Sequence, residues 1–299
     1  MKKILEHLKE YYFFLEKRVF ILSALFISIL IFINYYHNLN KIITTYSYDK
    51  QFYCWYIVFT AAFSFPYILT LFFKRQFKLL NSKFILLLLI APLIFSWKMV
   101  YKPEFHFTTN NILNDYWNQV AYWPFKLIVM VTILLITWQV FNREQHFYGI
   151  KSKNIQWRPY WVMLLIMAPL ISSAATQSDF LTVYPKFQQV LFLSQPQSSG
   201  WHQLLYELSY GTDFISIELF FRGFLILAFA HWAGKDAILP MALFYCTIHF
   251  GKPLGECISS FFGGIILGVV TFNTRTIWGG LMVHLGIAWM MELAGYIAK

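Results

Sequence analysis

The sequence predicts an all-α protein, a polytopic bundle of about nine membrane-spanning helices. Of its 299 residues, 58% are hydrophobic and only 13% are charged, whereas a soluble domain carries roughly 25% charged residues. The apolar residues also come in long blocks, and a spanning helix needs roughly 20 of them. A soluble fold of this length could not bury so much apolar surface in one core, so lipid must be the solvent for much of it.

The chain begins with a segment that is too polar to cross a membrane. Residues 1–18 mix charged, aliphatic and aromatic residues, which predicts an amphipathic helix lying on the membrane surface. Nine candidate spans follow, and because the third, fifth and seventh are short, eight to ten spans remain open. The nine candidates are 19–36, 52–73, 83–98, 120–141, 160–176, 211–231, 237–250, 256–273 and 276–297.

The basic residues predict the orientation of the chain. The net charge is +10, with 24 Lys and Arg against 14 Asp and Glu. Such a balance can indicate nucleic-acid binding, but most basic residues here flank hydrophobic spans. With the N-terminus in the cytoplasm, the inner segments hold about twice as many basic residues as the outer ones. We therefore expect a cytoplasmic N-terminus and the lipid bilayer, rather than a nucleic acid, as the partner of these charges.

The distribution of polar residues divides the membrane part into two regions. Residues 19–209 hold spans that are nearly free of acidic residues, and residues 210–299 hold spans in which ionisable residues gather. An ionisable side chain inside a span costs roughly 2.5–3.5 kcal/mol on insertion scales, so it needs a partner or a function. The region 210–299 is therefore the expected functional core.

The sixth predicted span contains a carboxylate and a guanidinium. Glu218 and Arg222 are four residues apart, so both lie on one face of the helix. At that spacing they can form a charge-assisted pair that offsets their desolvation. An ion pair that only holds helices together is an equally good interpretation of these two residues alone.

Two histidines lie in neighbouring predicted spans. His249 ends the seventh span, and His284 lies about eight residues into the ninth. A lone histidine on an apolar helix is more often a hydrogen-bonded core residue, but two of them beside a Glu–Arg pair indicate a site. Imidazole can take a proton, stabilise an oxyanion or bind a metal, and a carboxylate can activate water. Glu256 is expected to cap its helix, because a carboxylate is stabilised at the positive end of the helix dipole. Glu292 is a candidate to face the same cavity as His284.

Four segments of the C-terminal third carry a family resemblance. They are ELFFRGFLI at 218–226, FYCTIHFGKPLGE at 244–256, FFGGIILG at 261–268 and VHLGIAWMME at 283–292. In order and spacing they resemble the CPBP (Abi) family of intramembrane proteases, which includes the type II CAAX prenyl endopeptidases and bacteriocin-immunity proteins. Residues 1–209 resemble that family only in being hydrophobic helices.

The resemblance implies a role for each motif residue. The first motif of the family has two adjacent glutamates, then three residues and then an arginine; Glu218 and Arg222 match the second glutamate and the arginine. Ile217 stands in place of the first glutamate, which is usually assigned to activating water. The second motif is an aromatic residue followed four positions later by histidine, which matches Tyr245 and His249.

The last motif and the implied reaction complete the resemblance. His284 matches the histidine of the last motif, but Ala288 stands where the family usually has a polar residue. The resemblance implies a membrane endopeptidase of a bacterial cell membrane that hydrolyses a membrane-associated peptide or protein. Glu218 with His249 would activate water, Arg222 would hold Glu218, and His284 would stabilise the oxyanion. Zinc bound by His249 and His284 and a metal-free reaction both remain open.

Two other functions remain open from the sequence. A catalytically inactive relative would bind a membrane peptide or partner in the same pocket, and the substitutions at Ile217 and Ala288 favour it. A proton-coupled transporter would use the Glu–Arg–His cluster as a relay, but no repeated half of the chain is visible. Which peptide is the substrate does not follow from these residues.

Overall fold

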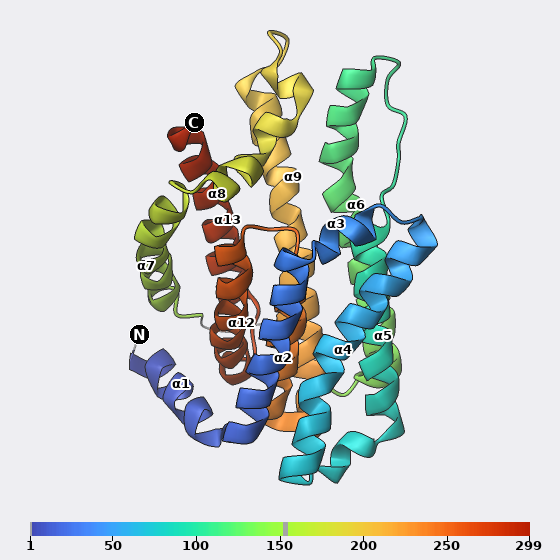
Figure 1. Ribbon diagram of the computed structural model, residues 1–299, viewed down its shortest axis with the longest axis vertical. Coiled ribbons are helices and arrows are strands. Elements are labelled where there is room, and N and C mark those ends of the chain that lie inside the picture. Colours follow the sequence, from blue (N-terminus) through green and yellow to red (C-terminus); the bar gives the residue numbers. More distant parts are fainter. Residues whose placement is uncertain (1, 152–154) are drawn as a thin grey trace. The chain divides into compact units, whose positions relative to one another are not determined.

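The computed structural model describes residues 2–151 and 155–299 (Figure 1), and these residues form helices and contain no strand. The predicted all-α fold class is therefore confirmed. In chain order the α-helices are α1 (Lys2–Phe14), α2 (Lys17–Tyr36), α3 (Leu39–Thr44), α4 (Tyr48–Lys74), α5 (Ser82–Val100), α6 (Asn111–Phe141), α7 (Arg158–Ala174), α8 (Ser178–Val183), α9 (Gly200–Glu218), α10 (Ala230–Ala233), α11 (Ile238–Thr247), α12 (Leu254–Thr274) and α13 (Trp278–Ala298). Short 3-10 helices are η1 (Phe77–Leu80), η2 (Lys186–Gln189), η3 (Leu191–Ser194) and η5 (Gly234–Ala237), and η4 (Leu219–Ala228) is a π-helix.

The predicted spans coincide with helices. Within the described residues, 7 runs are long and apolar enough to cross a membrane. Six of them are single helices that each coincide with one predicted span to within a few residues at the start of the span. The other run, Gly200–Thr247, contains two predicted spans, because Gly234 has a positive φ of 56° that ends α10 before α11 begins. The predicted span 160–176 falls on α7, which is apolar but shorter than the others.

The helices are grouped into two compact units that do not follow chain order. Unit 1 consists of Met1–Tyr101, Leu134–Asn154 and Leu219–Ile277, and unit 2 consists of Lys102–Ile133, Ile155–Glu218 and Trp278–Lys299. Among its passages from one unit to the other, the chain crosses within α6 and at the end of α9.

Unit 1 is built around α11, which packs against α12 and α4. The helix α4 in turn packs against α5 (Figure 1). Phenylalanine rings fill the space between these helices. Phe59 of α4 lies 4.9 Å from Phe244 of α11 and 5.9 Å from Phe95 of α5, measured between ring centroids. Aromatic pairs at these distances add about 0.5–1.5 kcal/mol beyond the area that they bury. This core fixes α11, and with it the residues that lead to His249.

The N-terminal helix α1 belongs to unit 1 and has two different faces. Ile4 and Tyr11 are buried, and α1 packs against α12. Tyr12 and Phe13 remain 68% and 72% exposed. Large exposed aromatic residues on an amphipathic helix are typical of helices that lie in the lipid interface. The helix therefore forms where the sequence predicts it, and its place on the membrane surface stays a prediction.

In unit 2, α13 packs along α7 and also contacts α9 (Figure 1). Glycine permits the close approach to α7: a Cβ atom added at Gly286 would lie 2.7 Å from Cδ2 of Leu164, and one at Gly279 would overlap the Tyr160 ring. Small residues are the usual means of close helix packing in membranes. This packing holds α13 against α7.

Candidate active site

The helix that carries Glu218 and Arg222 changes its type between these two residues. The α-helix α9 ends at Glu218, and the π-helix η4 begins at Leu219. All 10 residues of η4 are buried. π-Helical turns are rare and often occur at functional sites. Apolar periodicity does not distinguish an α-helix from a π-helix, so the sequence carried no signal for this change.

In unit 2, α9 and α13 bring a carboxylate and an imidazole together. Nδ1 of His284 lies 2.9 Å from Oε1 of Glu218, and the ring of Phe214 meets the His284 ring edge-on, with 4.7 Å between the centroids. Gly211, earlier on α9, faces Trp289, later on α13. The residue with the lower number on α9 contacts the residue with the higher number on α13, so α9 and α13 run antiparallel.

The bond between Glu218 and His284 determines which proton each group holds. Glu218 is 0% exposed, and a buried carboxylate is stable only with hydrogen-bond donors or opposite charge. An ionised carboxylate only accepts hydrogen bonds, so beside an ionised Glu218 the Nδ1 atom of His284 is the donor. In a neutral imidazole the other nitrogen, Nε2, is then the one that accepts a proton.

In unit 1, Tyr245 joins the two remaining residues of the expected site. The guanidinium carbon of Arg222 lies 4.1 Å from the centre of the Tyr245 ring, a cation–π contact, and Arg222 is 0% exposed. Nδ1 of His249 lies 2.8 Å from the carbonyl oxygen of Tyr245. A carbonyl only accepts, so Nδ1 of His249 is the donor and Nε2 is its acceptor nitrogen when the ring is neutral.

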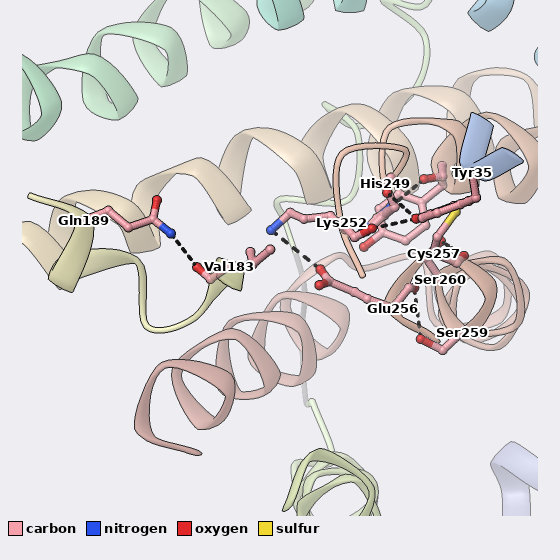
Figure 2. Close-up of polar contacts among 10 residues, drawn as sticks. Tyr35, Val183, Gln189, His249, Lys252, Glu256, Cys257, Ser259 and Ser260 are labelled. Carbon is pink, nitrogen blue, oxygen red and sulfur yellow. Dashed lines mark hydrogen bonds and ion pairs between the residues drawn. The ribbon is translucent and has the colours of Figure 1, made fainter. Parts of the chain in front are cut away.

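The turn that carries His249 is fixed by a tyrosine from a distant helix (Figure 2). The hydroxyl of Tyr35, on α2, donates a hydrogen bond of 2.6 Å to the carbonyl oxygen of Lys252 and lies 3.5 Å from that of His249. The ammonium of Lys252 lies 3.7 Å from the carboxylate of Glu256. Glu256 is in the first turn of α12, where the sequence placed it. The sequence contained no signal for Tyr35, because its partner is remote in the chain.

Glu292 lies further along the axis of α13 than the hydrogen bond between Glu218 and His284. Its Oε2 atom accepts a hydrogen bond of 2.8 Å from the backbone N–H of Lys186, in the segment that precedes α9. Eight residues of α-helix separate it from His284, a rise of about 12 Å. This contact ties the segment to α13, which gives Glu292 a structural role in unit 2.

Two apolar residues, Ala288 and Ile217, stand at positions where the family pattern is polar. Ala288, one turn after His284, is buried in a cluster with Tyr210, Phe214 and Leu281. It therefore supplies no hydrogen-bond donor beside the imidazole. Ile217 is partly exposed and precedes the buried Glu218 directly.

Some expected contacts would join residues of different units. Glu218 lies in unit 2, whereas Arg222 and His249 lie in unit 1. The pair of Glu218 with Arg222 and the convergence of Glu218 with His249 therefore stay predictions. The structure places Glu218 beside His284 and, separately, Arg222 and His249 beside Tyr245.

The donor set for a metal ion is small. Across residues 2–151 and 155–299, no group of three or more His, Cys, Asp or Glu side chains is arranged to hold a metal. Catalytic zinc usually takes three protein ligands. Two histidines fall short of that number, and zinc at His249 and His284 stays a prediction.

Comparison with known proteins places the family resemblance on this same part of the chain. Residues 208–290 match the family model described as type II CAAX prenyl endopeptidase Rce1-like. No curated protein and no solved structure matches the chain. The match contains Glu218, Arg222, His249 and His284, and together with the 7 apolar runs it characterises an integral membrane protein. Over residues 208–290 the chain is thus similar to the Rce1-like family of type II CAAX prenyl endopeptidases, which supports the resemblance to the CPBP family.

Proposed function

We propose that the protein is an intramembrane endopeptidase that hydrolyses a peptide bond of a membrane-associated substrate. One observation carries the proposal: a fully buried carboxylate, Glu218, is hydrogen-bonded at 2.9 Å to His284 within the segment that matches an endopeptidase family. A carboxylate–imidazole pair is a common means of activating water or a hydroxyl group for attack on a carbonyl carbon.

The exposure of the two side chains supports His284 as the group that contacts water. The His284 side chain is 13% exposed, whereas that of Glu218 is 0% exposed. Nε2 of His284 would take a proton from water while the water oxygen attacks the carbonyl carbon. The same proton would then pass to the leaving amine nitrogen as the C–N bond breaks. Glu218 would hold the ring in place and stabilise the imidazolium.

This assignment differs from the roles that the family resemblance implies. There Glu218 acts on water and His284 stabilises the oxyanion; here His284 acts on water and Glu218 acts through it. Arg222 and His249 remain candidates for stabilising the developing negative charge. A bacterial origin and a peptide or protein substrate at the membrane remain part of the proposal.

The test is cleavage of candidate membrane peptides by the full chain in lipid nanodiscs. Glu218→Gln and His284→Ala should each lower kcat by about 100-fold or more, because general acid–base groups contribute about 10²–10⁴-fold. Glu104→Gln and His106→Ala are matched controls at exposed positions and should retain wild-type rates. Equal rates in wild type, Glu218→Gln and His284→Ala would refute the assignment.

The apolar surroundings of Ala288 favour a second candidate function. A relative without peptidase activity would bind a membrane peptide and release it unchanged. In that case wild-type protein would bind the peptides without cleaving them, and the peptides would remain equally intact with Glu218→Gln. Mass spectrometry of the peptide after prolonged incubation distinguishes the two functions.

A further inference from the structure

We propose that Gly280 is a positioning residue, whose missing side chain allows the Glu218 carboxylate to reach His284. A Cβ atom added at Gly280 would lie 2.6 Å from Oε2 of Glu218 and 3.6 Å from its Cδ. Cβ atoms essentially never approach another heavy atom closer than 3.0 Å. Gly280 is also one turn before His284 on α13, so both residues face α9.

The carboxylate has little room to move away from an added methyl group. Its other oxygen, Oε1, is held 2.9 Å from Nδ1 of His284, and Glu218 is fully buried. The imidazole in turn rests against Phe214, with 4.7 Å between the ring centroids. A methyl group at Gly280 must therefore rotate the carboxylate or push α13 away from α9, and either movement lengthens the bond between Glu218 and His284.

Gly280 differs from other glycines of α13 in what it faces. Those glycines allow close packing against apolar side chains or backbone. A Cβ at Gly286 would meet Leu164, and one at Gly295 would meet the backbone of Tyr184. Gly280 is buried and faces an ionisable side chain instead. Neither helix packing nor the family motifs assign it a role.

The activity test rests on the proposed function. Gly280→Ala should lower kcat by about 100-fold, the loss expected when a catalytic group is misplaced by about 1 Å, with KM nearly unchanged. Gly286→Ala is a matched control: its Cβ would lie 2.7 Å from Leu164, an equally tight contact on the same helix, but away from Glu218. It should keep kcat within about twofold. Equal loss of kcat in both variants would assign the effect to helix packing and overturn the proposal.

A spectroscopic test does not depend on peptidase activity. In protein labelled with ¹⁵N-histidine, the Nδ1 proton of His284 should give a downfield resonance that disappears in His284→Ala. This resonance should shift or vanish in Gly280→Ala and persist in Gly286→Ala. An unchanged resonance in Gly280→Ala overturns the positioning role even if wild type cleaves peptides. A wild type that cleaves nothing but shows these shifts refutes only the proposed function.

A stability cycle covers the case in which Gly280→Ala does not fold. Replacement of Glu218 by alanine removes the carboxylate that the new methyl group would meet. The double variant Glu218→Ala/Gly280→Ala should therefore unfold at the same temperature as Glu218→Ala alone. A double variant that unfolds at a clearly lower temperature than Glu218→Ala alone would show that the crowding does not involve Glu218.

Discussion

The imidazole of His284 and the carboxylate of Glu218, 66 residues apart in the chain, form a hydrogen bond of 2.9 Å. Because Glu218 is fully buried, loss of a partner from this pair is costly, and we expect the two groups to act as one unit. Removal of the imidazole leaves Glu218 without this donor, and removal of the carboxylate leaves His284 without its orienting acceptor.

The first prediction concerns the additivity of variants of this pair. Glu218→Gln and His284→Ala should each reduce kcat strongly, but the double variant should be no slower than His284→Ala alone, because residues that act as one unit give non-additive losses. Initial rates at saturating peptide measure all three. Losses that multiply in the double variant would mean that Glu218 and His284 act independently.

The sequence predicted the fold better than the contacts of the site. Hydropathy identified the spans because lipid requires long apolar helices, and each predicted span coincides with a helix. It could not identify the π-helix after Glu218, because π- and α-helices place similar demands on apolar residues. The spacing of four residues suggested Arg222 as a partner of Glu218, which stays a prediction, but it carried no signal for the hydrogen bond between Glu218 and His284. Bonds between distant helices, like those of Tyr35, depend on packing that one sequence does not display.

The second prediction concerns the cation–π contact between the Tyr245 ring and the Arg222 guanidinium. Tyr245→Phe keeps an aromatic face 4.1 Å from the buried guanidinium, whereas Tyr245→Leu removes it. A desolvated cation–π contact is worth about 2 kcal/mol. Tyr245→Leu should therefore lower the free energy of unfolding by about 2 kcal/mol or more, and Tyr245→Phe by clearly less. Thermal unfolding in detergent measures both, and equal losses would show that the ring is not what stabilises Arg222.

The third prediction concerns the hydroxyl that fixes the turn of His249. Tyr35→Phe removes the hydrogen bond of 2.6 Å to the Lys252 carbonyl and should destabilise the turn by about 1 kcal/mol. Amide hydrogen exchange over residues 249–252 should become faster, since local opening requires less free energy. Tyr36→Phe is the matched control, because Tyr36 is the next residue and is 69% exposed. If both variants exchange alike, the hydroxyl of Tyr35 does not hold the turn.

The fourth prediction concerns the side of the membrane on which the chain begins. Basic residues concentrate in segments that share a side with the N-terminus, and such segments stay in the cytoplasm. Lys3 and Lys50 are both exposed and precede and follow the first span, α2. In a variant whose three native cysteines are replaced, a membrane-impermeant maleimide added outside intact cells should label Lys50→Cys but not Lys3→Cys. Labelling of Lys3→Cys alone would reverse the orientation, and with it the side on which α1 meets the lipid.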